Sequence, residues 1–363
     1  MGLLKNIKRE IKKYKLKQKI NEDISKYKYV HIMYNDKFNK PFVDFLNKYF
    51  DSNEHMVLCS RSSTDYVARP FPEGKNVYEF IKLDGLNLRA QNIEKIIFHS
   101  LFTKGCVDYL YENKDILEKS YWRIWGGDLY RAPRDKKNDY VRENFKGYIG
   151  IIDREYALSK YPTMPDNFYK MFYNFPLSKE MLDKALETVS RDSKTTVIQI
   201  NNSCDYSTLE MLDILSKFRD ENIRIVTILS YGKMEYKDKI IHKGKEIFGD
   251  KFEYVQNWIF PKDYANHLAQ NDIFILNQNR QQGFGNTIAS LYTGSKVYIK
   301  KDISVNKYLN NDGIKIFNSE DIQNQTFEEF IEYKEKEQSI KNISKYLDDN
   351  YLAQLIKDFF DEE

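Results

Sequence analysis

The stretch Asn271–Thr287 combines an apolar run, a polar loop with two glycines and the start of a helical pattern. The run Ile273–Leu276 is long enough for a buried parallel strand. A strand, a glycine-bearing loop and a helix form anion sites in α/β proteins, because the first N–H groups of the helix lack partners and carry partial positive charge. Arg280 adds a fixed cation that suits a diphosphate. The alternative is an ordinary loop with an exposed arginine, because this glycine spacing alone is a weak signal.

In the same stretch, Gly283 and Gly285 allow close backbone approach, and the expected N-cap of the helix is Asn286 or Thr287. Polar residues also follow other expected strands. Ligands of open α/β sheets gather at the carboxyl edges of the strands. Three further segments stand at such edges: His99-Ser100, Asn201-Asn202-Ser203 and Ser230-Tyr231-Gly232.

Two longer motifs carry a resemblance to a known family. Residues 122–130 read WRIWGGDLY, which is similar to the W-x-I-W-G-x-D-L-Y signature of the TDP-N-acetylfucosamine:lipid II N-acetylfucosaminyltransferases, glycosyltransferase family 56. Residues 280–285 read RQQGFG and resemble the R-Q-Q-G-x-G of that family. Order and spacing agree over roughly residues 96–299, whereas the first seventy residues and the tail carry no match.

Two shorter segments extend the resemblance. Residues 200–203 together with Asp205 resemble a strand-end G-N-S-x-D of the family, except that Asn201 stands where the family has glycine. Ser230-Tyr231-Gly232 falls where the family has a Gly-Tyr pair.

The resemblance implies a hexosyltransferase of the GT-B type, an α/β protein with two Rossmann-like domains whose parallel sheets face across a cleft. Such an enzyme would move a sugar from a nucleoside-diphosphate donor to a lipid-linked or surface glycan in bacterial polysaccharide synthesis, as for the enterobacterial common antigen. We expect a TDP-sugar, carrying an N-acetylated dideoxyhexose, and a peripheral location on the cytoplasmic face of the inner membrane.

The donor would bind to three loops of the C-terminal domain. The leaving diphosphate needs positive charge, and the chain contains no Asp-x-Asp pair for a metal, so the helix N-terminus and Arg280 would supply it without a metal or another cofactor. The alternative for Gln281 and Gln282 is that they are simply exposed to solvent. The alternative for residues 201–203 is that they form a turn and cap the next helix. The expected donor-binding residues are Arg280, Gln281, Gln282, Gly283, Phe284, Gly285, Asn286, Thr287, Asn201, Asn202, Ser203, Tyr231 and Gly232. The segment Trp258-Ile259-Phe260-Pro261 could pack against the base, or it could belong to the core.

The acceptor hydroxyl must lose a proton if the configuration inverts. Asp128, after two glycines, is one candidate for the base, and His99 at a strand end is the other. If the configuration is retained, Asp128 would instead hold the acceptor, beside Trp125, Gly126 and Gly127. Of the remaining histidines, His31 is expected to be structural because it lies mid-strand, and His55, His242 and His267 belong to no motif.

Alternating strand and helix patterns must position these residues, and they predict a parallel α/β domain at 23–176 and a second at 177–324, followed by a helical tail at 325–363. Met171–Pro176 is expected to be a strand that leads into the linker. The first series of expected strands is Tyr29–Met33, His55–Cys59, Asn76–Phe80, Ile93–His99, Tyr121–Trp125 and Tyr148–Ile152. The second series is Thr195–Ile200, Ile223–Leu229, Phe252–Val255, Ile273–Leu276 and Lys296–Ile299.

Residues 1–22 form an expected basic amphipathic helix, whose first 20 residues would contact an anionic membrane surface. A solvated helix packed on the domain is the alternative. A net charge of +3 argues against nucleic acid as a partner, and three scattered cysteines argue against disulfides or a zinc site. Two other functions stay open: a GT-B nucleotide-sugar epimerase, and a non-catalytic protein of polysaccharide assembly.

Overall fold

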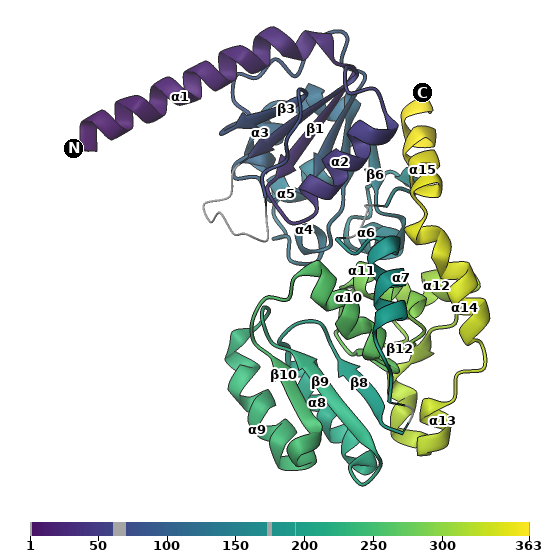
Figure 1. Cartoon of the computed structure of the whole chain (residues 1–363). Helices are drawn as coiled ribbons and strands as arrows, with labels where there is room; N and C mark the ends of the chain where they lie inside the picture. Colours follow the sequence, from purple (N-terminus) through teal and green to yellow (C-terminus); the bar gives the residue numbers. More distant parts are fainter. Residues whose placement is uncertain (1, 61–69, 173–175, 193, 363) are drawn as a thin grey trace. The chain divides into compact units, whose positions relative to one another are not determined.

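The computed structural model of the chain describes residues 2–60, 70–172, 176–192 and 194–362 (Figure 1). It divides into two compact units, which are described separately. The first unit comprises Met1–Pro176 together with Leu352–Glu363, and the second comprises Leu177–Tyr351. The chain from residue 325 onward therefore contributes to both units, whereas its sequence pattern predicts a single helical tail.

The first unit contains a sheet of seven parallel strands among its described residues, in the order β3-β2-β1-β4-β5-β6-β7. Helices of this unit flank the sheet in Figure 1. The strands are β1 (Tyr29–Tyr34), β2 (His55–Ser60), β3 (Val77–Phe80), β4 (Lys95–His99), β5 (Ser120–Arg123), β6 (Gly147–Ile149) and β7 (Phe168–Tyr169). The helices that matter below are α1 (Gly2–Asp23), α2 (Asn39–Tyr49), α4 (Gly127–Tyr130), α5 (Lys136–Glu143) and α15 (Asp349–Asp361).

The central strands of this sheet are buried along their whole length. Every residue of β2, β4 and β5 is buried, and so are the first five of β1. Continuous apolar runs of this kind are typical of parallel strands that are covered on both faces, and side chains such as Ile32, Leu58, Ile96, Phe98 and Trp122 form the core.

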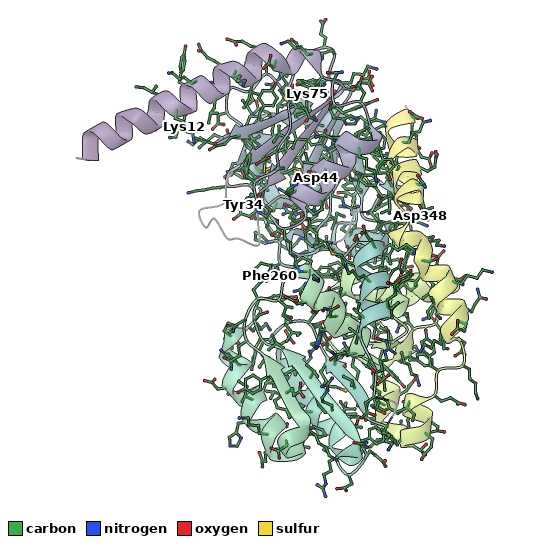
Figure 2. The ribbon with its side chains drawn as sticks, viewed as in Figure 1. Lys12, Tyr34, Asp44, Lys75, Phe260 and Asp348 are labelled. Atoms are coloured by element: carbon green, nitrogen blue, oxygen red, sulfur yellow. The ribbon has the colours of Figure 1, made fainter. Side chains whose placement is uncertain are left out.

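The basic helix α1 projects from the first unit in Figure 1, and its C-terminal half is anchored to that unit. Lys12, labelled in Figure 2, donates to Glu79 of β3 at 3.0 Å. The Asn21 side chain donates to the carbonyl of Gly85 at 2.8 Å and accepts from the N–H of Asn87 at 2.9 Å. No helix in the described part of the chain has the length and apolar composition needed to cross a bilayer.

The C-terminal helix α15 completes the first unit. Lys95, the first residue of β4, donates from Nζ to the carbonyls of Phe359 at 2.7 Å and Phe360 at 3.2 Å, and also to that of Glu362. A lysine at this position satisfies carbonyls that have no partner within the helix and complements the negative end of its dipole.

The second unit contains a sheet of six parallel strands, again counted over described residues, in the order β10-β9-β8-β11-β12-β13. A buried lysine has the same role here, since Lys296 of β12 donates to the last carbonyls of α13 (Phe327–Ile331), at 2.8 Å from Glu329 and 2.9 Å from Phe330. The strands are β8 (Thr196–Ile200), β9 (Ile223–Ile228), β10 (Phe252–Val255), β11 (Ile273–Leu276), β12 (Lys296–Ile299) and β13 (Phe317–Asn318). The helices named below are α7 (Lys179–Thr188), α8 (Tyr206–Leu215), α10 (Pro261–Gln270) and α11 (Phe284–Tyr292).

Most predicted strands are present, and the differences lie at their ends. The predicted strand Tyr148–Ile152 was wrong beyond Ile149, because Ile151–Asp153 forms a 3-10 helix. The short edge strands β7 and β13 were not predicted. The predicted strand Met171–Pro176 lies partly outside the described residues, and Met171 and Phe172 are not in a strand.

Candidate active site

Three loops meet at the carboxyl edge of the second sheet, after β8, β9 and β11. The Gln282 side chain donates to the Ser203 hydroxyl at 2.7 Å and to the Asn202 amide oxygen at 3.2 Å. Gln278 donates to the same two groups at 3.3 and 3.4 Å. Cys204 and Gly232 form a parallel bridge that joins the loop after β8 to the loop after β9. The structure thus brings the sequence-predicted residues of all three loops together.

Asn201 explains the one departure from the family motif at the end of β8. Its φ is 53°, a left-handed conformation that glycine adopts most readily and that asparagine tolerates better than most residues. Its side chain donates to Thr208 at 2.8 Å and accepts from the backbone N–H of Asn277 at 2.9 Å. This fully buried side chain therefore joins the first turn of α8 to the loop after β11.

Asp205, the last residue of that motif, is the N-cap of α8. Its carboxylate accepts from the N–H of Ser207 at 3.0 Å. This bond satisfies one of the first N–H groups of the helix. Asn201 and Asp205, the two polar residues at the ends of the motif, therefore both stabilise the local structure.

Two glycines let the loops approach closely. A Cβ on Gly232, where φ is 107°, would lie 2.4 Å from the carbonyl oxygen of Cys204. A Cβ on Gly283, where φ is 71°, would lie 2.2 Å from the Asn202 amide nitrogen. A larger residue at 232 would therefore force the loops after β8 and β9 apart, and one at 283 would displace the Asn202 side chain.

Helix α11 begins immediately after Gly283, which is its N-cap. The prediction of Asn286 or Thr287 as the N-cap was wrong, because both lie in the first turn and the Thr287 hydroxyl donates to the Gly283 carbonyl at 3.2 Å. The first N–H groups of any α-helix have no acceptor within the helix. Here they belong to Phe284, Gly285 and Asn286, at the point where the three loops meet.

Arg280 lies just before this helix start and is half-buried. Its Nη1 donates to the Gln281 carbonyl at 3.3 Å. Burial raises the pKa of the Tyr231 phenol and the Arg280 cation opposes that rise, so the two side chains lie within electrostatic range. The edge therefore combines a guanidinium, a helix N-terminus and amide side chains, which is a chemistry suited to a diphosphate.

Trp258 and Phe260 lie in the segment between β10 and α10. They are 44% and 53% exposed, and Phe260 is labelled in Figure 2. The alternative that these two side chains belong to the hydrophobic core was therefore wrong. They present aromatic surface in the same unit as the three loops after β8, β9 and β11.

In the first unit, Asp128 holds the predicted WGGD turn together. Its Oδ2 accepts from the Trp122 indole at 2.7 Å and from the Leu101 backbone at 3.1 Å, and its Oδ1 accepts from the Trp125 backbone at 2.9 Å. Burial raises the pKa of this carboxyl, and the three N–H donors oppose the rise. Only 3% of Asp128 is exposed. Its contacts explain why the tryptophan and the aspartate occur in one motif.

Hydrogen bonds also hold the residues around Asp128 in place. Arg142 of α5, which sequence reasoning missed, donates from Nε and Nη2 to the Asp128 carbonyl at 3.2 and 3.1 Å and lies over the Trp122 ring at 5.3 Å. Leu101, held by the carboxylate, lies two residues beyond His99. The residue between them, Ser100, has a φ of 72°, which is a strained conformation for serine.

His99, the other predicted base, is fully buried and bonded to a second histidine. Its Nε2 lies 2.9 Å from Nδ1 of His31, whose Nε2 lies 3.1 Å from Nδ1 of His55. Burial lowers the pKa of His99 well below the ordinary value, and the Arg123 cation lowers it further. The histidine contacts could not be predicted from the sequence, because 24 and 68 positions separate the partners.

The predicted acceptor residues lie among aromatic side chains. The Trp125 ring packs edge-on against Phe38 at 5.8 Å. Gly126 has a φ of 81°, and a Cβ on Gly127 would lie 2.9 Å from the Phe102 ring and 2.8 Å from the Arg131 guanidinium. A larger residue at 127 would displace one of these two side chains.

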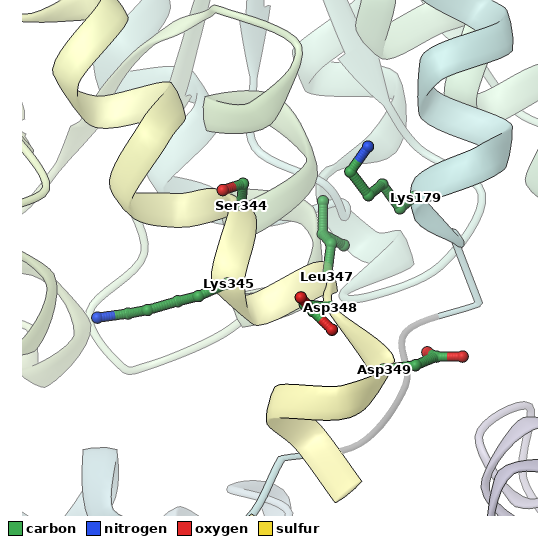
Figure 3. A pocket seen from close by; sticks show the side chains of 6 residues that line it. All are labelled: Lys179, Ser344, Lys345, Leu347, Asp348 and Asp349. Atoms are coloured by element: carbon green, nitrogen blue, oxygen red, sulfur yellow. The ribbon is translucent and has the colours of Figure 1, made fainter. Parts of the chain in front are cut away.

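A separate pocket of about 440 Å³ lies in the second unit. It is lined by Lys179, Ser344, Lys345, Leu347, Asp348 and Asp349 (Figure 3). Its two lysines already pair with Asp183 at 2.8 Å and Asp312 at 2.7 Å, and none of the predicted site residues lines it. Among the described residues, no group of three or more His, Cys, Asp or Glu side chains is arranged to hold a metal ion.

Two parallel α/β units of this kind are the architecture of the GT-B glycosyltransferases. Similar solved structures include sucrose-phosphate synthase from Thermosynechococcus elongatus, with a TM-score of 0.65 and 9% identity over 92% of this chain and 98% of that one. HepE from Anabaena, in complex with UDP and glucose, has a TM-score of 0.61 and 11% identity over 92% and 99%. A putative UDP-N-acetylglucosamine 2-epimerase from Listeria monocytogenes has a TM-score of 0.55 and 12% identity over 93% and 98%. At these identities the likeness shows the fold alone.

The family is shown by the sequence itself. The profile described as 4-alpha-L-fucosyltransferase, glycosyl transferase group 56, matches residues 86–357. The chain belongs to this family, and the predicted family membership is confirmed. The protein is accordingly a hexosyltransferase that uses a nucleotide-sugar donor.

Proposed function

We propose that this enzyme moves an N-acetylated dideoxyhexose from a TDP-sugar to a lipid-linked glycan during the synthesis of a bacterial surface polysaccharide. The observation that carries the proposal is the meeting of Arg280, the start of α11 and the loops after β8 and β9 at one sheet edge. This edge would receive the donor diphosphate, and the exposed Trp258 and Phe260 would pack against its base.

Departure of the nucleoside diphosphate would need no metal ion. Negative charge grows on the leaving phosphate in the transition state. The first N–H groups of α11 and the Arg280 guanidinium are fixed positive groups, so they need little rearrangement to meet that charge. Gln281, Gln282, Asn202 and Ser203 would add hydrogen bonds to the phosphate or sugar.

In an inverting reaction His99 would accept the proton of the acceptor hydroxyl. Both oxygens of Asp128 already accept hydrogen bonds from protein N–H groups, which favours a positioning role for this carboxylate. It would hold the turn after β4 by its bond to Leu101, and it would hold the Trp125-Gly126-Gly127 loop in place for the acceptor.

Helix α1 would bring the enzyme to the cytoplasmic face of the inner membrane. On either side of Lys12, which contacts β3, the helix carries exposed Ile11 and Tyr14 at 49% and 61%; they are three residues apart and so lie on one face. Lysines at 12, 13, 15, 17 and 19 add positive charge around them. Apolar side chains among lysines are what an interfacial helix on anionic lipid requires.

A donor-binding screen tests the core of the proposal. Calorimetry with TDP-, UDP- and GDP-sugars should show tightest binding of a TDP-sugar, and binding should survive a metal chelator. The same donors, incubated with enzyme but no acceptor, should be recovered unchanged. Recovery of an epimerised donor would favour the epimerase alternative, and failure to bind any nucleotide sugar would favour the assembly protein.

A further inference from the structure

An exposed phenylalanine lies at the carboxyl edge of the first sheet, although both of its neighbours in the chain are buried. Phe102, in the loop after β4, is 41% exposed, whereas Leu101 and Thr103 are each 7% exposed. The backbone is held on both sides of the ring, because the Leu101 N–H donates to Asp128 Oδ2 at 3.1 Å and the Phe102 N–H donates to the Ser100 hydroxyl at 3.4 Å. The loop therefore presents this aromatic ring to solvent from a fixed backbone.

A guanidinium group lies beside the ring. Gly127 is the first residue of α4, and Arg131 is the residue that follows this helix. A Cβ on Gly127 would lie 2.9 Å from the Phe102 ring and 2.8 Å from the Arg131 guanidinium, so both side chains lie against the same bare backbone. Arg131 is exposed, and its side chain forms no hydrogen bond or ion pair within the part of the chain that the structure describes.

Other side chains hold α4 in place. Lys160 donates to the carbonyls of Leu129 at 2.6 Å and Tyr130 at 3.5 Å, and the Tyr130 phenol donates to Asp153 at 2.8 Å. These bonds fix the helix to the unit through its carbonyls and its tyrosine, and none of them uses Arg131. The fold thus places a cation next to an exposed aromatic ring without using that cation for its own stability.

The three groups together suit a particular kind of ligand. A guanidinium donates paired hydrogen bonds to a phosphate or a carboxylate, an aromatic ring packs against the apolar face of a sugar, and a glycine lets a ligand approach the backbone closely. A single exposed phenylalanine or a single surface arginine is ordinary. Here both lie at one glycine, directly after the Trp125-Gly126 turn. This combination fits a sugar ring that carries an anionic group.

We propose that Phe102, Gly127 and Arg131 form a subsite for an anionic glycan acceptor. The ring would pack against a sugar of the acceptor, and the guanidinium would bind an anionic group next to that sugar. This inference rests on the proposed function, transfer of a sugar to a glycan. Two sources of the anion share the same chemistry: the phosphate that links a glycan to its lipid, and the carboxylate of a uronic acid within the glycan. An uncharged acceptor would make no bond of this kind and would bind less tightly.

Calorimetry with three farnesyl probes tests the subsite and identifies the anion. The probes are N-acetylglucosaminyl farnesyl diphosphate, farnesyl glucuronoside and the uncharged farnesyl N-acetylglucosaminide. The full-length enzyme is first saturated with TDP, so that a diphosphate probe cannot occupy the proposed donor site. At least one anionic probe should bind about tenfold more tightly than the uncharged probe. Preference for the diphosphate probe would identify the linking phosphate, and preference for the glucuronoside would identify a carboxylate. Equal affinities, or no binding of any probe, would overturn the proposal.

Variants assign the preference to particular side chains. Arg131→Ala should weaken binding of the preferred anionic probe by about 10- to 100-fold, the loss of one or two charged hydrogen bonds, and leave the uncharged probe unaffected. Phe102→Ala should weaken all three probes alike. Lys75→Ala is the matched control, because it removes one exposed cation just before β3, at the amino edge of the same sheet (Figure 2). A preference that survives Arg131→Ala, or one that Lys75→Ala removes equally, would refute the assignment.

Gly127→Ala separates binding from stability. The atoms that its Cβ would meet are the ends of the Phe102 and Arg131 side chains, which can move away, and a helix accepts alanine readily. We therefore expect an unchanged Tm together with a lower affinity for the anionic probe. A lower Tm with unchanged affinity would show that this glycine serves only the fold, and it would contradict the subsite.

Failure of this inference can be distinguished from failure of the proposed function. Calorimetry with TDP alone tests the donor site first. If TDP does not bind, the proposed donor site fails, and the same titrations without nucleotide still decide the acceptor subsite. If TDP binds and Arg131→Ala leaves the affinity for both anionic probes unchanged, the subsite alone is refuted.

Discussion

Acidification from pH 7 to pH 5 should remove several kcal/mol of the free energy of unfolding, because the histidine chain, formed by the hydrogen-bonded rings of His55, His31 and His99, is buried in its neutral form. In the unfolded chain each histidine has a pKa of about 6.5. Burial lowers the folded pKa of His55 to about 4 and those of His31 and His99 well below 6.5. Between these values the unfolded state binds protons that the folded state does not, so stability is complete above pH 6.5 and falls as the pH drops.

The size of the effect follows from the number of rings. A proton bound only by the unfolded state changes stability by about 1.4 kcal/mol per pH unit. Between pH 7 and 5 that amounts to about 1.8 kcal/mol for each histidine, or about 5 kcal/mol for three, against a typical total of about 5–15 kcal/mol. Paired carboxylates contribute mainly below about pH 5. Asp128 acts in the opposite direction, because burial raises its pKa.

Urea unfolding at pH 7.5, 6.5, 5.5 and 5.0 measures the effect. Trp122 and Trp125 report on the first unit and Trp258 on the second, so fluorescence of single-tryptophan variants separates the two. The first unit should lose stability with a slope of about three protons. In His31→Phe the slope should fall by one proton or more, because the remaining two rings are no longer bonded to a third. A free energy of unfolding that stays constant from pH 7 to 5 would refute the reasoning.

Three further predictions concern the proposed function. Arg280→Ala should weaken donor binding by about 1.5–3 kcal/mol, the usual value of a charged hydrogen bond; calorimetry with the exposed Arg219→Ala as control would contradict this if the two variants bind alike. Asp128→Asn should lower both turnover and thermal stability but spare donor affinity, because its amide would turn at least one N–H toward a buried N–H donor; unchanged stability would argue against a positioning role. Deletion of residues 1–19 should abolish sedimentation with anionic vesicles and leave activity on a soluble acceptor intact, whereas vesicle binding that survives the deletion would indicate another membrane surface.

Much of the fold could be predicted because parallel strands leave a strong signal. Runs such as Phe252–Val255, Ile273–Leu276 and Lys296–Ile299 match the observed strands residue for residue. The two-residue strands β7 and β13 have no such run. The predicted N-cap of α11 was three or four residues too late, because Gly283 acts as N-cap through its backbone conformation and has no side-chain oxygen to indicate it.

For the candidate site, too, some features could be predicted from the sequence and others could not. Residues within one motif, such as Trp122 and Asp128, could be associated from their spacing. Their mutual hydrogen bond could not be predicted, and it changes the role that we assign to the carboxylate. The histidine chain depends on strand order and register, which bring together residues that belong to no common motif. Only the three-dimensional arrangement could identify His31 and His55 as neighbours of His99.

The return of the last helix to the first unit also determines the order in which the protein is completed during synthesis. The Phe360 ring packs against His55 and His31. Lys95 has no helix end to bind until residues 359–362 exist. The second unit is entirely encoded before that point. The second unit is therefore synthesised before the helix that completes the first unit, and a chain that stops before residue 359 would contain all of the second unit and only part of the first.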